Sequence, residues 1–200
     1  MMKLLTATLA LLLGACSSIS IKPVEQAVIN ISIEGQDRIR FSGKGAGAGM
    51  MMSASMGSMG IAIGVAIDEG ISKEIHESFV ASGGSFSEIV MSETTTWLSV
   101  LCQDNLKKLN DLCSANATLN VRVYRYGFVT TSGENDPIKA ELDIGFVVSN
   151  QTELRLDISE LDDAPVAALE KAKKEGEISL GLLTKGYQTL LEEFISEHTK

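Results

Sequence analysis

The sequence predicts an α+β protein: a small antiparallel sheet packed by helices, plus a Gly-rich helical or hairpin segment. Polar and apolar residues alternate between 117 and 159, as in half-buried strands, and apolar residues recur at helical spacing before and after that region. Strands joined by short turns, without strict alternation of strand and helix, favour α+β over α/β.

The first residues, 1–15, have the features of a bacterial signal peptide. Lys3 is their only charge, and the apolar run at 4–13 is too short to span a bilayer as a helix. The run ends in Leu13-Gly14-Ala15-Cys16, which resembles the lipobox of bacterial lipoproteins. An ordinary secretory signal with a chance cysteine is the alternative interpretation.

The lipobox resemblance implies a compartment and one covalent modification. It implies acylation of Cys16, with this covalent lipid as the attached group and no other cofactor, and stable anchoring because several acyl chains hold a protein firmly on a membrane. Ser17, where an Asp would retain the protein at the inner membrane, implies the outer membrane of a Gram-negative cell. We expect the domain to face the periplasm.

The charge of the chain argues against a nucleic-acid partner. The full sequence has 17 basic and 26 acidic residues, so the chain without Lys3 has 16 basic residues and a net charge of about −10. Such a surface repels nucleic acids and anionic headgroups.

Residues 16–27 are expected to be a tether, and residues 28–42 a β-hairpin. Ile29, Ile31 and Ile33 alternate with polar residues, the tripeptide at 35–37 is turn material, and alternation resumes at Ile39.

The Gly-rich segment, residues 43–70, is the most unusual part of the chain. Residues 45–67 are 23 consecutive uncharged residues, and one helix of that length would reach ~35 Å, against ~30 Å for a hydrocarbon core. Small residues at helical spacing allow helices to pack closely, so we expect a glycine zipper that contacts membrane lipid or neighbouring protomers. The expected contact residues are Gly45, Gly49, Gly57, Gly60 and Gly64.

The composition of this segment allows three other interpretations. It is compatible with a Gly-rich helix or hairpin buried in the soluble domain, and with a loop. It also formally matches a dinucleotide fingerprint at Gly43, Gly45 and Ala48. No strand ending in an acidic residue follows the next helix, so we reject nucleotide binding.

Residues 71–200 are expected to form an α+β periplasmic domain. Its predicted elements, in order, are the end of a helix that begins near 61, a short strand at 85–93, a helix at 94–112, strands at 117–131, 137–149 and 152–159, and a long helical region from 165 that breaks near Gly176 or Gly181.

Cys102 and Cys113 form an even pair in an exported chain, which favours a disulfide. On one continuous helix they would be ~16 Å apart, too far for a bond. Either the helix breaks near Lys107–Asn110 or both are buried free thiols.

The sequence offers no catalytic or metal-ligating set, so we expect no enzyme and no metal. His76 lies among charged residues, and adjacent acidic pairs do not share a helix face. Arg122 and Arg125 are expected to pair across strands with Glu141 and Asp143.

Two resemblances complete this picture. The lipobox with the Gly-rich stretch resembles glycine-zipper envelope lipoproteins, such as surface-exclusion lipoproteins, and residues 71–198 look like α+β modules of lipoproteins that assist export or assembly. They imply a non-catalytic protein that anchors, associates or assembles envelope components, with membrane lipid and a homo-oligomer or envelope-complex subunits as partners. The alternative is an accessory binding lipoprotein of a transport or secretion system, with the Gly-rich segment inside the domain.

Overall fold

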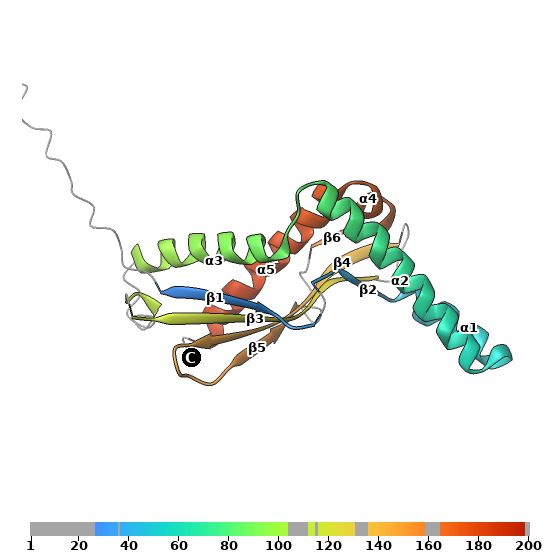
Figure 1. Ribbon diagram of the computed structural model, residues 1–200, viewed down its shortest axis with the longest axis horizontal. Coiled ribbons are helices and arrows are strands. Elements are labelled where there is room, and N and C mark those ends of the chain that lie inside the picture. Colours follow the sequence, from blue (N-terminus) through green and yellow to red (C-terminus); the bar gives the residue numbers. More distant parts are fainter. Residues whose placement is uncertain are drawn as a thin grey trace, which may run out of the picture.

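The computed structural model describes residues 27–35, 37–103, 112–114, 116–130, 136–158 and 165–198 (Figure 1). These residues form an α+β fold, as predicted, in which helices cover one face of a six-stranded sheet. The expected signal peptide and Cys16 lie outside the described residues.

The sheet is mixed rather than antiparallel. Its main path runs β1-β3-β4-β5, with β2 also pairing with β3 and β6 with β4. The β3–β4, β4–β5 and β4–β6 pairs are antiparallel, as predicted for these segments, whereas β1 and β2 run parallel to β3. The strands are β1 (Val28–Ile33), β2 (Arg40–Ser42), β3 (Thr118–Thr130), β4 (Pro137–Val148), β5 (Leu154–Asp157) and β6 (Val166–Ala168).

The prediction of a β-hairpin at 28–42 is wrong. β1 and β2 do not pair with each other; they follow one another along the same edge of β3, with Val28 opposite Thr118 and Ser42 opposite Val129. The alternation in this segment does correspond to strands. Each strand pairs with β3, about 90 residues further along the chain, and the two do not pair with each other.

The helices also differ in part from expectation. The short strand predicted at 85–93 is wrong, because these residues lie at the start of α3, which ends at Gln103. The long helical region begins instead with β6, and its helix breaks between Lys174 and Gly176. The helices are α1 (Lys44–Met56), α2 (Ser58–Ala81), α3 (Phe86–Gln103), α4 (Leu169–Lys174) and α5 (Gly176–His198).

The hydrophobic core lies between the sheet and the helices α2, α3 and α5. The inward side chains of β4 alternate as predicted and meet aromatic rings of the helices: Phe146 lies 4.8 Å from the Phe194 ring and 6.4 Å from the Tyr187 ring. The Tyr187 hydroxyl is buried and lies 2.7 Å from Thr94 Oγ1, so the one polar group of this ring has a partner.

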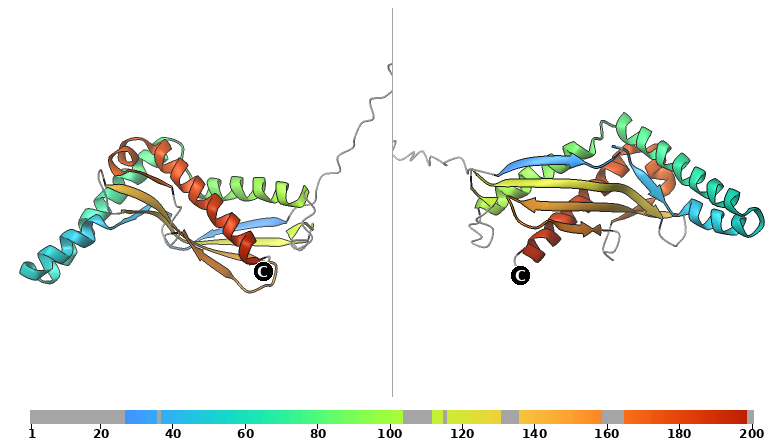
Figure 2. Two further views of the ribbon diagram at one scale, coloured as in Figure 1. Left: turned by 180° about the vertical axis from the view of Figure 1, so that it is seen from behind. Right: turned by 60° about the horizontal axis from the view of Figure 1, so that its bottom comes forward.

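None of the described helices lies over the other face of the sheet (Figure 2), which is lined with ion pairs. Arg125 pairs with Glu141 at 3.2 Å, as predicted, and with Asp157 at 3.2 Å. Asp143 instead pairs with Arg155, whose guanidinium also lies over the Tyr124 ring. Burial raises the pKa of Glu141 above its ordinary value, although Arg125 opposes the shift.

The predicted boundary between a Gly-rich segment and a domain at 70/71 does not hold. α2 runs unbroken from 58 to 81, and its last turns pack against α4 and α5, while its first turns pair with α1 beyond the sheet (Figure 1). The strands at 28–42 belong to the same sheet as the rest. The described residues therefore form one body with a projecting arm.

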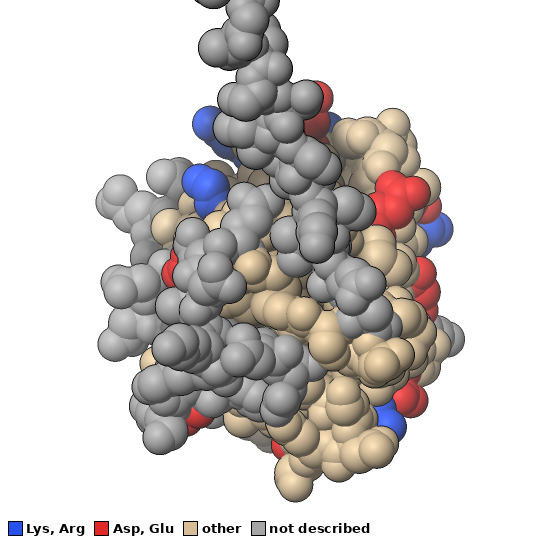
Figure 3. Space-filling model, turned by 90° about the vertical axis from the view of Figure 1, so that its left-hand side faces the viewer, with Lys and Arg blue, Asp and Glu red and all other residues tan. Residues whose placement is uncertain are grey.

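The two ends of this body differ. Figure 3 views the end where β1 begins, and its described surface is mainly uncharged with acidic side chains along one side. The helical arm of α1 and α2 projects from the opposite end (Figure 1).

Candidate functional site

The projecting arm is a helical hairpin in which α1 and the first half of α2 lie against each other. Glycines form the seam between them. A Cβ on Gly45 would lie 1.8 Å from the Gly64 carbonyl oxygen, and one on Gly60 would lie 2.4 Å from the Ser53 nitrogen. The glycines therefore allow backbone-to-backbone packing that no larger residue permits.

The hairpin turns at Gly57, whose φ of 59° lies in the left-handed region that favours glycine. Of the two forms expected for this segment, helical or hairpin, it takes a helical hairpin, because the chain reverses halfway. Gly57 itself has no neighbour within 4 Å of an added Cβ.

The interpretation of the glycines as contacts to other molecules also needs correction. Gly45, Gly49, Gly60 and Gly64 are buried against the other helix of the same chain, so the zipper closes inside the molecule. Gly57 is a turn residue rather than a contact residue.

The outer surface of this hairpin is apolar and exposed. Met51 is 84% exposed and Met50 71%, while Met59, Ile61 and Val65 are each more than half exposed. The alternative in which this segment is buried inside the domain is therefore wrong. A shallow groove of about 410 Å³ runs along the seam, lined by Gly45, Ala46, Gly49, Met50, Ile61, Gly64, Val65 and Asp68.

The open end of the hairpin is closed by Asp68, the first acidic residue after the uncharged stretch. Its Oδ1 accepts the Gly45 N–H at 2.6 Å and its Oδ2 accepts the Gly43 N–H at 3.3 Å. Because α1 has no side-chain cap of its own, this carboxylate on α2 satisfies the first amides of α1 and faces the positive end of its dipole.

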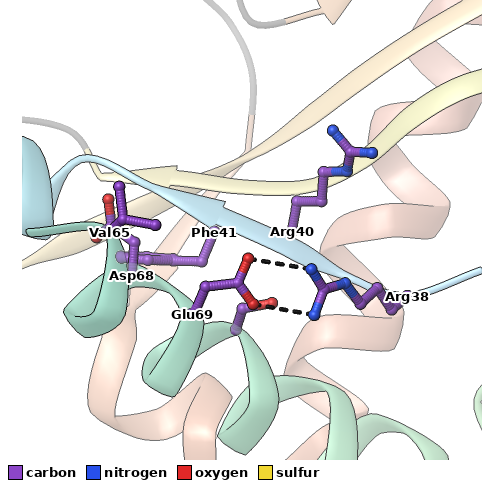
Figure 4. A pocket seen from close by; sticks show the side chains of 7 residues that line it. Arg38, Arg40, Phe41, Val65, Asp68 and Glu69 are labelled. Atoms are coloured by element: carbon purple, nitrogen blue, oxygen red, sulfur yellow. Dashed lines mark hydrogen bonds and ion pairs between the residues drawn. The ribbon is translucent and has the colours of Figure 1, made fainter. Parts of the chain in front are cut away.

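A pocket of about 360 Å³ lies at this base, between β2 and α2 (Figure 4). Arg38 donates two hydrogen bonds to Glu69, at 2.9 and 3.0 Å, and Arg40 extends away from them. Asp68 is occupied by the amides of α1. The ion pair between Arg38 and Glu69 thus holds the arm to the body. Among the residues that line this pocket, no nucleophilic side chain contacts a general base.

Two further contacts of α2 hold the same segment of chain. The Ser72 hydroxyl donates to the Ile39 carbonyl at 2.5 Å, and the Ile39 N–H donates to His76 Nδ1 at 3.4 Å. His76, which the sequence places among charged residues, is half-buried and accepts a hydrogen bond from the backbone.

The remaining predicted site residues lie elsewhere. Cys102 and Cys113 are joined by a disulfide, with their Cα atoms 5.4 Å apart, at the end of the molecule away from the hairpin. A Cα separation of 5.4 Å is incompatible with one continuous helix through both cysteines, so the helix predicted at 94–112 does not run unbroken to Cys113.

The dinucleotide-like glycines offer no phosphate site, because the amides of Gly43 and Gly45 already donate to Asp68. Among the described residues there is no group of three or more potential metal ligands. In the same part of the chain, no helix is both long and apolar enough to cross a membrane.

Sequence reasoning missed the clamp formed by Arg38, Asp68, Glu69 and Ser72. One signal was available for Asp68: it is the first charge after 23 uncharged residues, and α1 begins after a glycine that cannot cap it. Nothing in the sequence indicates which strand the clamp holds.

Comparison of this chain with protein-family models, with curated proteins and with solved structures gave no match.

Proposed function

We propose that this protein is a non-catalytic lipoprotein of the bacterial cell envelope, acylated at Cys16 on the outer membrane and facing the periplasm. It acts by association, and the α1–α2 hairpin is the element through which it contacts the membrane or other envelope components.

The observation that carries this proposal is the exposed apolar surface of the projecting hairpin. Large side chains such as Met51 and Met50 are exposed on an arm with no charge between 45 and 67. Contiguous apolar surface on a soluble protein marks a site of interaction with protein or membrane. The charges on the open face of the sheet, by contrast, pair with one another.

The disulfide supports an exported location. Cys102 and Cys113 are bonded, and such bonds persist in oxidising compartments such as the periplasm. The lipobox residues and this bond are independent features of the sequence that favour the same compartment.

Lipid labelling tests the anchor. Cells that express the full precursor are grown with labelled palmitate, and label is expected in the wild-type protein and not in Cys16→Ser. The double variant Cys102→Ser/Cys113→Ser is the matched control, because it removes two cysteines and should still be labelled. Absence of label from the wild type would contradict the lipoprotein assignment.

Fractionation of the same cells tests the hairpin. Cys16→Ser protein, exported but not acylated, is expected to remain partly with membranes or in a complex larger than a monomer. A further Met51→Asp change should release it as a monomer, whereas Val100→Asp, at a site on α3 that is 56% exposed, should not. A Cys16→Ser protein that is entirely monomeric and free would refute association through the hairpin.

An accessory subunit of a transport or secretion system is the second candidate. The same projecting apolar arm supports it, since such subunits also act by docking. The two candidates differ in one expected result. If the protein is an accessory subunit, the Cys16→Ser protein should elute in size-exclusion chromatography together with other proteins and not with lipid.

A further inference from the structure

We propose that the partner of the hairpin is the hydrocarbon of a phospholipid bilayer, into which residues 45–67 insert as a wedge one leaflet deep. This inference rests on the proposed function and names its partner. The surface that would contact lipid is the outer surface of the hairpin, because its glycines pack α1 against α2.

The distribution of apolar side chains around α1 favours lipid over a one-sided protein contact. Met50, Met51 and Met52 are consecutive, so they point in three directions about 100° apart, and each is more than a third exposed. A helix that is apolar on all its exposed sides is typical of a membrane environment, whereas docking on one partner needs a single stripe.

The length of the uncharged arms matches one leaflet. The arm of α1 from residue 45 to 56 is ~18 Å long, and the arm of α2 from 58 to 67 is ~15 Å long. Half of a hydrocarbon core of ~30 Å is ~15 Å. The tip at Gly57 would then lie near the middle of the bilayer.

Charged residues begin at the same level on both arms, where the headgroups would lie. Lys44 at the start of α1 pairs with Asp136 at 2.6 Å, and on α2 the Asp68 side chain contacts the Gly45 amide. Arg38 and Glu69 pair just beyond them (Figure 4). The hairpin thus changes from uncharged to charged at one plane across its axis.

Two of the three serine hydroxyls of the arm are partnered inside it. The hydroxyls of Ser53 and Ser55 donate to the carbonyls of Met50 and Met52, at 2.8 and 3.1 Å. Hydroxyls satisfied in this way remove much of the cost of placing serine in hydrocarbon.

The tether reaches the membrane in which the hairpin would insert. Val28 and Ser42 pair with residues eleven positions apart on β3, so the start of β1 lies ~36 Å from the base of the hairpin. Cys16 precedes Val28 by twelve residues, which span up to ~40 Å when extended. The lipid anchor and the wedge can therefore occupy the same bilayer, and each raises the local concentration of the other.

Vesicle binding tests the wedge without the anchor. The probe is the mature chain from residue 16 with Cys16→Ser, mixed with phosphatidylcholine vesicles at low and high salt. We expect binding that does not weaken with salt, because the arm has no charge. Met51→Asp should bind about 100-fold more weakly, whereas the matched control Val100→Asp should bind like the parent.

Depth measurement tests the geometry. Single cysteines at Ala46, Met56 and Val100, each labelled with an environment-sensitive dye in the Cys16→Ser chain, are compared with lipids that have quenchers at known depths. The label at 56 should be quenched from the bilayer centre, that at 46 from the headgroup region, and that at 100 by neither.

Two results would overturn the wedge. One is vesicle binding that is absent or equal in the parent and Met51→Asp. The other is a dimer without lipid in which Met51→Cys cross-links between chains, since a second copy would then cover the hairpin. In that second case association through the hairpin would stand, and only its lipid partner would be wrong.

Discussion

The Asp68 carboxylate caps a helix to which it does not belong: its Oδ1 accepts the Gly45 N–H at 2.6 Å across the hairpin. This contact joins the two arms at their base, where the chain enters and leaves the body. It is a contact on which the position of α1 depends.

Asp68→Ala should therefore loosen α1 while the sheet stays folded. Loss of a capping carboxylate costs about 1 kcal/mol, and that cost falls on the hairpin alone. Hydrogen exchange should show faster exchange of α1 amides and unchanged exchange in β3. Glu69→Gln, which breaks an exposed pair with Arg38, serves as the neighbouring control and should leave α1 nearly unchanged. Equal protection of α1 in Asp68→Ala and wild type would refute the cap.

Gly64→Ala should force the two arms of the hairpin apart. The added Cβ would lie 2.3 Å from the Gly45 carbonyl oxygen, a backbone atom that cannot move aside alone, so we expect a cost of 1–3 kcal/mol or more. Gly47→Ala is the control, because no atom lies within 4 Å of its added Cβ. Faster amide exchange across 44–67 in the first variant only is the expected result; two variants that behave alike would show that the seam is not tight.

Tyr187→Phe should destabilise the whole body. It leaves the buried Thr94 hydroxyl without its partner at 2.7 Å, which costs about 1–3 kcal/mol and is measured as a lower midpoint of urea unfolding. The double variant Tyr187→Phe/Thr94→Val removes both polar groups and should recover most of the loss. If the double variant is as unstable as the sum of its parts, the hydrogen bond is not the cause.

Glu141→Gln should change how stability depends on pH. Burial raises the pKa of Glu141 in the folded state above its ordinary value of 4.5, so its ionised form disfavours folding. That penalty is absent well below pH 4.5 and complete once the pH exceeds the raised pKa. The stability of wild type relative to Glu141→Gln should thus fall as pH rises from 4 to 7, as measured by urea unfolding at each pH. A difference that stays constant or grows in favour of wild type would contradict the shift.

The sequence predicted the structure best where a short segment has one apolar face and one polar face. Six inward residues of β4, from Ile138 to Val148, follow from alternation, because half-buried strands require it. The pair between Arg125 and Glu141 follows from the antiparallel strands, which place Asp143 opposite Arg125 and Glu141 diagonally across from it. Of the two glycines near which a break was predicted, only Gly176 marks one, and Gly181 lies within α5. A Cβ on Gly176 would lie 2.1 Å from the Ser78 carbonyl oxygen, so close packing against α2 distinguishes the two positions and helix propensity does not.

It failed where a partner is remote or a short pattern is ambiguous. The strand at 28–33 has the alternation of any strand, and nothing in it specifies a parallel partner at 118–123 instead of the segment after the turn. At 85–93 the alternation is too short to separate strand from helix.

Glycine spacing in the zipper showed the same limit. It indicates that a backbone approaches closely, and the partner turned out to be the other arm of the same hairpin. The 23 uncharged residues can form one helix or a helical hairpin. The choice depends on Gly57, whose conformational freedom allows both a helical residue and a turn.

The parallel pairing of β1 with β3 also sets an order of assembly. During synthesis, β1 emerges before the partner that Asn30 meets at Asn120, ninety residues later. The β3–β4 pair closes over a short connection and forms early, whereas closing the long loop to β1 costs more chain entropy. The sheet edge that β1 forms is therefore expected to be completed last, after the antiparallel pairing of β3 with β4.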